Sequence, residues 1–258
     1  MKLLLIFTIL LTQTVFAQQR LIMVGGGKRT PDVLTKIVEW SGGEKNKLLI
    51  ITWASGEPEA SLESIKKDFA AVSKIDLVPA PFSPLNEEKK AKLIQQLQSA
   101  NGIFFTGGDQ NRIMEVLKDA ELFELFRQKY KEGVLMSGTS AGTAIMSEVM
   151  ITGEGDIKVI DGEKIETKKG LGFLTSSIVD QHFIKRQRQN RLISLIFKHP
   201  NLLGIGIDEN TALLVENNRK ASVLGESKVM VFQKLKPKNE MKFTILEKGK
   251  TFDLNKRK

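Results

Sequence analysis

The chain has 258 residues, of which 41% are hydrophobic and 27% are charged, so its composition is that of an ordinary globular protein and not of a disordered one. This length is enough for one sizeable α/β domain. The chain has no cysteine, which excludes disulfide bonds, a thiolate nucleophile and a thiolate metal site. The formal net charge of +9 at pH 7 could favour an anionic partner. With one Tyr, two Trp and no interleaving of basic and aromatic residues, we expect no nucleic-acid partner.

Residues 1–17 have the pattern of a secretory signal peptide. A positive start at Lys2 precedes an apolar run over 3–11, and Ala17 offers a small residue for cleavage before Gln18. The run is too short and too interrupted for a comfortable membrane span, which argues against the alternative of an uncleaved anchor. We therefore expect export to a periplasm or to the exterior, and a single α/β domain over residues 18–258.

Strands and helices alternate along the first half of the chain. Apolar runs predict buried strands at 20–24, 47–52, 74–79, 102–106 and 134–136. Amphipathic spacing predicts helices at 31–40, 59–72 and 86–99, from 110 onward, and at 121–132. This alternation predicts a mostly parallel sheet with helices on both faces.

The pattern changes after residue 149. We predict short strands and loops over 151–169, a strand at 171–180, a helix at 185–198 and a strand at 203–209. A small antiparallel series should follow at 212–216, 221–225 and 228–232. The last, basic segment is expected to be partly frayed.

A G-x-S-x-G pentapeptide at 138–142 follows a predicted strand and precedes good helix formers. Strand, sharp turn and helix are the context of a nucleophile elbow, in which Ser140 would be the nucleophile. The amide of Ala141 could donate to an oxyanion. The alternative is a tight turn whose serine only caps the helix. Glycine-rich loops at 25–27, 107–108 and 138–142 all end predicted parallel strands, so they should lie at one edge of the sheet.

A serine nucleophile usually needs a histidine base, and the chain has two histidines. His199 lies at a helix end, where capping or exposure explains it. His182 follows a predicted strand directly and can lie at the same edge as Ser140. Asp208 and Glu209 end the next strand, and pattern alone cannot choose which of them orients the base. The order Ser, His, acid argues against an ordinary α/β-hydrolase.

Four cationic residues follow His182, namely Lys185, Arg186, Arg188 and Arg191. Because a guanidinium binds carboxylates through a planar fork, this cluster suggests a substrate with an acidic group. A solvated helix face is the alternative. Asp180 could bind a cationic substrate group, or could simply cap the turn.

Four motifs together resemble those of cyanophycinases, which belong to the serine peptidase family that also contains the aspartyl dipeptidases (peptidase E). They are Gly107-Gly-Asp-Gln110, Gly138-Thr-Ser-Ala-Gly142, Asp180-Gln-His-Phe183 followed by Arg186-x-Arg188-x-x-Arg191, and Gly206-Ile-Asp-Glu209. The resemblance covers nearly all of the chain after residue 17. It implies a flavodoxin-like fold related to class I glutamine amidotransferases, with a small antiparallel C-terminal extension.

The resemblance also implies roles for individual residues. Ser140 would be the nucleophile, His182 the base and Glu209 the orienting acid. Independently of the resemblance, we expect amides of Ala141 and of Gly107 or Gly108 to stabilise the oxyanion. Residues that would hold the substrate are Gln110, Asp180, Arg186, Arg188 and Arg191.

The substrate implied is cyanophycin, a poly-aspartate with arginine on each β-carboxyl, from which β-Asp-Arg dipeptides are released. We expect no metal or organic cofactor, and the resemblance suggests a homodimer. Thr143 departs from the pattern, since alanine is expected after the elbow. Aspartyl or isoaspartyl dipeptides are the alternative substrates. Two non-catalytic alternatives are an acidic-peptide-binding protein on the same fold and a polyanion-binding surface protein, which the net charge suggests.

Overall fold

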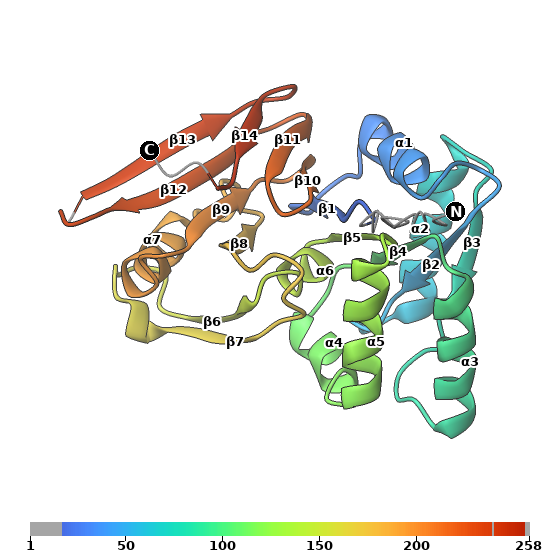
Figure 1. Ribbon diagram of the computed structural model, residues 1–258. Helices are drawn as coiled ribbons and strands as arrows, with labels where there is room; N and C mark the ends of the chain where they lie inside the picture. The colour runs from blue at the N-terminus through green and yellow to red at the C-terminus, as the bar shows by residue number, and fades with distance from the viewer. Residues whose placement is uncertain (1–16, 239, 256–258) are drawn as a thin grey trace, which may run out of the picture.

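Two β-sheets, one of eight strands and one of four, form the centre of the fold (Figure 1). The computed structural model describes residues 17–238 and 240–255. The predicted signal peptide therefore lies outside the described residues, apart from Ala17 at its proposed cleavage site. Among the described residues, no helix is both long enough and apolar enough to cross a membrane.

Five neighbouring strands of the larger sheet run parallel, in the order β1-β5-β4-β2-β3. They are β1 (Arg20–Val24), β2 (Lys47–Ile51), β3 (Asp76–Pro79), β4 (Gly102–Phe105) and β5 (Leu135–Thr139). All but the edge strand β3 are almost wholly buried, as strands covered on both faces must be. The prediction of a mostly parallel α/β sheet is confirmed.

Helices cover both faces of this sheet, because each helix turns one apolar stripe towards it (Figure 1). They are α1 (Pro31–Trp40), α2 (Pro58–Ala70), α3 (Glu87–Ser99), α4 (Gln110–Val116) and α5 (Ala120–Lys131). α1 and α2 pack on one face, where Ile37 and Phe69 are buried in a shared cluster. α3, α4 and α5 pack on the other, where Leu93 and Phe126 belong to a second cluster.

The last part of the chain contributes antiparallel strands to both sheets. β10 (Thr211–Glu216), β11 (Lys220–Gly225) and β14 (Thr251–Asp253) extend the larger sheet beyond β1. β12 (Val229–Leu235) and β13 (Glu240–Leu246) join the parallel pair β8 (Ser177–Gln181) and β9 (Leu203–Ile207) in the smaller sheet. The expected antiparallel series is thus divided between two sheets. β13 and β14 were not predicted and occupy much of the segment that was expected to fray.

Elements near the serine and histidine differ from the expected ones. The helix expected at 185–198 is α7 (Gln189–Lys198), because residues before it form a turn in which the Ile184 and Lys185 amides donate to Asp208. The helix after Ser140 is α6 (Ala141–Ala144), a single turn. The strand expected at 171–180 is limited to β8. The remaining elements are β6 (Val149–Gly155), η1 (Gly162–Lys164) and β7 (Ile165–Lys169).

The glycine-rich loops after β1, β4 and β5 lie at one edge of the larger sheet, as predicted, because these strands are adjacent and parallel. Gly25 has no room for a side chain, since a Cβ there would lie 2.2 Å from the carbonyl oxygen of Asp208. Gly26 has a φ of +112°, and a Cβ added there would lie 2.2 Å from Cε1 of His182. The absence of a side chain at Gly26 therefore leaves room for the imidazole ring. These glycines therefore allow the two sheets to meet closely.

Phe126 is fully buried and contacts the rings of Trp53 and Phe105, which lie near the ends of neighbouring strands. We expect Phe126→Ala to lower the free energy of unfolding by about 3–5 kcal/mol, through lost burial and a cavity. Phe123→Ala, on the half-buried side of the same helix, is the matched control and should cost on the order of 1 kcal/mol. Urea denaturation of both variants measures the difference, and equal losses would contradict this account of the core.

Candidate active site

Ser140 lies in a strained turn between β5 and α6, with φ of 51° and ψ of −109°. A non-glycine residue enters this region at an energetic cost, and the surrounding structure has to hold it there. The Ser140 amide donates to the carbonyl of Val24 at 3.0 Å, which fixes the turn to the end of β1. Its side chain makes no capping hydrogen bond to α6, so the alternative of a capping serine is wrong.

Thr143, the residue that departs from the family pattern, supports the same turn. Its side chain is fully buried, and its hydroxyl donates to the carbonyl of Val24 at 2.7 Å. Val24 thus accepts hydrogen bonds from both Ser140 and Thr143. An alanine at 143 could not make this second link between α6 and β1.

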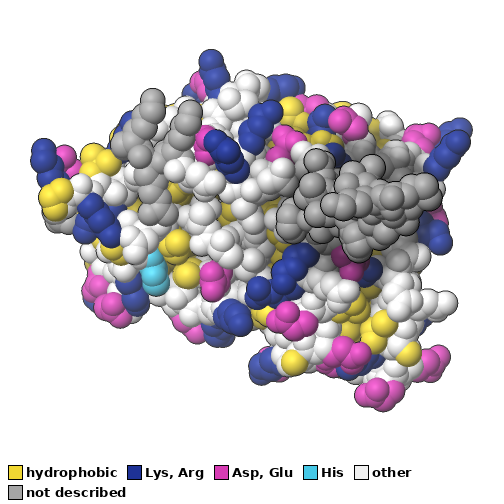
Figure 2. All heavy atoms as spheres, viewed as in Figure 1, with side chains coloured by type: hydrophobic (Ala, Val, Ile, Leu, Met, Phe, Trp, Pro, Cys, Tyr) yellow, Lys and Arg dark blue, Asp and Glu magenta, His cyan; other side chains and the backbone are white. Residues whose placement is uncertain are grey.

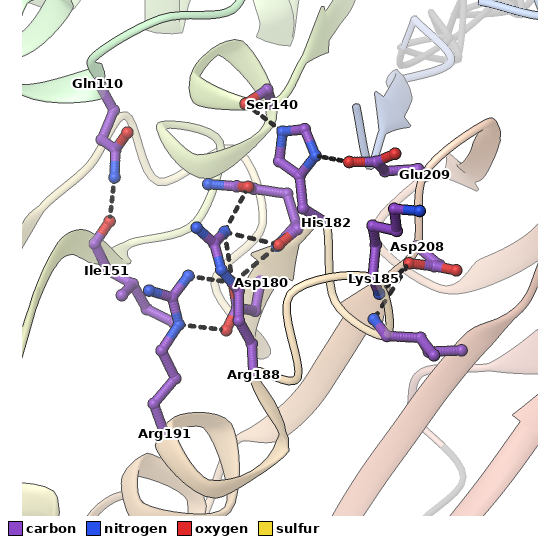
Figure 3. A network of polar contacts seen from close by, with 12 residues as sticks. Gln110, Ser140, Ile151, Asp180, His182, Lys185, Arg188, Arg191, Asp208 and Glu209 are labelled. Atoms are coloured by element: carbon purple, nitrogen blue, oxygen red, sulfur yellow. Dashed lines mark hydrogen bonds and ion pairs between the residues drawn. The ribbon is translucent and has the colours of Figure 1, made fainter. Parts of the chain in front are cut away.

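His182 lies between Ser140 and Glu209 (Figure 3). Its Nε2 is 2.9 Å from Oγ of Ser140, and its Nδ1 is 2.6 Å from Oε1 of Glu209. With Nδ1 protonated, the ring donates to Glu209 and accepts the hydroxyl proton of Ser140 through Nε2. The other histidine, His199, is the C-cap residue of α7 and is not part of this array.

The base and the acid come from the smaller sheet, whereas the serine comes from the larger one. His182 follows β8 and Glu209 lies just beyond β9, its parallel neighbour. The amide of His182 donates to the carbonyl of Gly25 at 2.7 Å, so the end of β1 holds the base as well as the serine turn. His182 itself has a left-handed φ of 49°, which directs the ring away from the strand.

The structure separates Asp208 from Glu209, which the sequence pattern could not. One carboxylate oxygen of Asp208 accepts from the amides of Ile184 and Lys185, and the other accepts from the Ser227 hydroxyl. Asp208 therefore holds the turn that follows the histidine, and Glu209 contacts the histidine itself. This assignment agrees with the one that the family resemblance implied.

Burial lowers the pKa of His182 below its ordinary value of 6.5. The hydrogen bond to Glu209 opposes this shift, and the positive charges of Arg186 and Arg188 reinforce it. A lowered pKa keeps the imidazole neutral at physiological pH. Neutral imidazole is the form that can accept a proton from a serine.

Backbone amides suited to an oxyanion surround the serine. Gly107 lies beside it, since a Cβ on Gly107 would be 3.8 Å from Oγ of Ser140. Within the described residues, the amides of Gly107, Gly108 and Ala141 have no backbone acceptor. These donors are therefore free to bind a developing negative charge.

Asp180 and Arg191, both predicted to contact substrate, are bound to each other in this structure. Both side chains are almost fully buried. Nε and Nη2 of Arg191 donate to the two carboxylate oxygens of Asp180 at 2.6 and 2.5 Å (Figure 3). Separating a buried pair this close would leave two unpaired charges, which is costly.

The guanidinium of Arg188 has fewer hydrogen bonds to protein carboxylates than that of Arg191. It precedes α7 as the N-cap residue, and its Nη1 donates to the backbone and side-chain oxygens of Gln181 at 2.7 and 2.6 Å. Burial, together with repulsion from Arg191, lowers the pKa of Arg188 to about 10, so it remains charged at neutral pH. Arg186 is exposed and has no ion-pair partner among the described residues.

Two amide side chains complete the lining. Gln110, at the start of α4, donates through Nε2 to the carbonyl of Ile151 at 2.8 Å, which leaves its Oε1 unbonded within the described residues. Gln181 uses its Oε1 for Arg188, which leaves its Nε2 as an unused donor in the part of the chain described. Gln181 was not predicted as a site residue, although its place beside His182 in the Asp-Gln-His-Phe motif was a signal.

Away from the arginines that follow His182, positive and negative side chains are mixed on the surface that Figure 2 shows. Figure 2 shows one face of the molecule, on which Lys and Arg side chains are interspersed with Asp and Glu. Across the described residues, no group of three or more His, Asp or Glu side chains is arranged to hold a metal ion. The concentrated positive charge next to Ser140 comes from the arginines after His182.

Comparison with known proteins supports this picture. The family model described as peptidase family S51 matches residues 21–223. The chain is 33% identical over 214 residues to a cyanophycinase of Trichormus variabilis, which covers 81% of this chain and 72% of that protein. It is 31% identical to a cyanophycinase of Geminocystis herdmanii, with coverage of 84% and 81%.

A solved structure of a peptidase from an acI-B1 actinobacterium has a similar fold. Its TM-score is 0.68 at 21% sequence identity, and the match covers 92% of this chain and 97% of that one. The flavodoxin-like fold that the resemblance implied is thereby confirmed. The chain therefore belongs to peptidase family S51, and it is a serine-type peptidase.

Proposed function

We propose that this peptidase is of the cyanophycinase type and hydrolyses multi-L-arginyl-poly-L-aspartate to β-Asp-Arg dipeptides. The observation that carries the proposal is the set of cationic and amide side chains around the catalytic pair. The charges of Arg186 and Arg188 act on His182, Gln181 accepts a hydrogen bond from Arg188, and Gln110 begins α4. Carboxylates of the dipeptide would bind the free edges of Arg186 and Arg188. The unused Oε1 of Gln110 and Nε2 of Gln181 would bind its guanidinium and amide groups, since Asp180 is committed to Arg191.

The reaction would proceed through an acyl-enzyme. Nε2 of His182 takes the hydroxyl proton as Oγ of Ser140 attacks the scissile carbonyl carbon. Amides of Ala141 and of Gly107 or Gly108 stabilise the oxyanion, and Glu209 stabilises the imidazolium. His182 then donates its proton to the leaving amine, and water hydrolyses the acyl-enzyme. No step requires a metal or an organic cofactor.

Aspartyl or isoaspartyl dipeptides are the second candidate substrates, because such a peptide also carries a carboxylate beside its scissile bond. Similarity to proteins named cyanophycinase, at more than 30% identity, favours the polymer. Incubating the protein with cyanophycin, with α-aspartyl dipeptides and with isoaspartyl dipeptides separates the two. Release of β-Asp-Arg from the polymer supports the proposal, and cleavage restricted to dipeptides refutes it.

Ser140→Ala should reduce turnover on the order of ten-thousand-fold or more, since the nucleophile is lost while binding and oxyanion donors remain. His182→Ala should have a comparable effect. Ser99→Ala, an exposed serine at the end of α3, is the matched control and should retain full activity. Steady-state assay of dipeptide release measures all three. Near-normal turnover by Ser140→Ala would exclude the mechanism.

The pH dependence of kcat/KM should report the neutral form of His182. Its pKa is lowered by burial, so the rising limb should have its midpoint below pH 6.5. Arg186→Gln removes a positive charge that disfavours the imidazolium, so the midpoint should move to higher pH. Arg219→Gln, an exposed arginine on the far end of the larger sheet, should leave the midpoint unchanged. A midpoint unaffected by Arg186→Gln would contradict this electrostatic account.

We propose further that the protein is exported after cleavage following Ala17. Gln18 and Gln19 bond to Glu216 and Asn217 at the end of β10, so β1 would remain anchored once the leader is removed. N-terminal sequencing of protein from the periplasmic or external fraction of the native host should begin at Gln18. Recovery of the chain from the cytosol with Met1 retained would exclude export.

A further inference from the structure

A cavity of about 670 Å³ opens at the carboxyl ends of β2 and β3 and the start of α3, at the same edge of the sheet as the serine turn. Its volume lies in the range of small-molecule sites. Trp53 and Leu122 supply apolar walls, and Ser55, Glu87 and Arg112 supply polar ones. None of these five residues belongs to the catalytic array or to the arginine cluster.

The cavity adjoins the glycine loop that supplies oxyanion donors. Gly108 packs against the backbone of Ala54 and Ser55, since a Cβ on Gly108 would lie 2.1 Å from the Ala54 carbonyl oxygen. The amide of Asp109 donates to the same carbonyl at 2.9 Å. Ser55 lines the cavity, and Arg112 lies one helical turn beyond this loop on α4. The cavity and the glycine loop thus share a wall.

The cavity and the arginine cluster lie on opposite sides of the nucleophile. Ser140 follows β5, whose neighbours on one side are β4 and then β2, at the end of which the cavity opens. The arginines follow β8 in the other sheet. Figure 1 places β8 and α7 on one side of α6, and β2 and α3 on the other. A peptide that crosses Ser140 from the arginine cluster would therefore run towards the side of the cavity.

Some charged side chains that line the cavity are paired with other residues, and others are not. Lys90 is committed, since it pairs with both Asp119 and Glu121 at 2.7 Å. Arg112 and Glu87 are exposed, and neither side chain has an ion-pair or hydrogen-bond partner among the described residues. The buried hydroxyl of Thr52, which also lines the cavity, is without a hydrogen-bond partner in the described chain. The cavity therefore offers one free cation, one free anion and an apolar wall.

We propose that this cavity binds the next repeating unit of the polymer, across the scissile bond from the dipeptide held by the arginine cluster. One β-Asp-Arg unit carries a carboxylate, a guanidinium and the methylene chain of arginine. The fork of Arg112 takes the carboxylate, Glu87 takes the guanidinium, and Trp53 and Leu122 pack against the methylenes. The inference rests on the proposed polymer substrate and adds a second subsite to it.

Titration calorimetry on the inactive Ser140→Ala protein, with ligands of one and two β-Asp-Arg units, tests the proposal. The two-unit ligand should bind about tenfold more tightly than one unit, because the second unit occupies the cavity. Adding Arg112→Gln or Glu87→Gln should abolish that gain and leave the affinity for one unit unchanged. Both residues are exposed, so neither change is expected to affect folding. Adding Arg219→Gln, the matched charge loss elsewhere, should preserve the gain.

The outcomes distinguish this subsite from the proposed function. If one unit binds and the second adds no affinity, the cavity proposal is wrong and the substrate class stands. An Arg112→Gln variant that weakens one-unit binding as much as two-unit binding also overturns it, since Arg112 would then act at the dipeptide pocket. If neither ligand binds, the polymer substrate and the second subsite both fail. In the active enzyme, Arg112→Gln should raise KM for the polymer and leave kcat unchanged.

Discussion

The carboxyl end of β1 holds the two halves of the site together. The carbonyl of Val24 accepts the amide of Ser140, and the carbonyl of Gly25 accepts the amide of His182. These two hydrogen bonds join a nucleophile from the larger sheet to a base from the smaller one. The distance of 2.9 Å between Nε2 and Oγ depends on both. Because a shift of about 1 Å in such an array is costly to catalysis, β1 has to be rigid here, and its burial between two neighbours provides that rigidity.

The close contact of the two sheets at the end of β1 explains two glycines and two strained backbone conformations. Gly25 and Gly26 lie so close to Asp208 and to the His182 ring that a Cβ at either position would collide. Ser140 and His182 both have left-handed backbone conformations, which cost energy and persist only where the surroundings impose them. Each is anchored by its own amide to β1. The strain thus occurs at the two residues whose side chains must point out of their elements towards each other.

The sequence predicted the parallel sheet and the position of the serine turn well, because buried strands and glycine turns are local signals. It could not show that His182 and Glu209 belong to a second sheet, since pairing of β8 with β9 and of β9 with β12 is a long-range property. Helix propensity extended α7 back to residue 185, because the pattern does not reveal that Asp208 accepts the amides of that segment. For the same reason, the pattern did not show that two of the four charged residues assigned to the substrate, Asp180 and Arg191, bind each other.

That buried pair determines the charge of the pocket. Asp180 neutralises Arg191, and Arg188 is held at the edge of the pair by Gln181, so the positive charge left facing the serine belongs to Arg188 and Arg186. The same two cations lower the pKa of His182, after burial as the main cause. Binding of a substrate carboxylate would offset their effect on the imidazole and favour its protonated form. The imidazolium is the form that develops when His182 removes the serine proton, so an acidic substrate would assist the base through the charges that bind it.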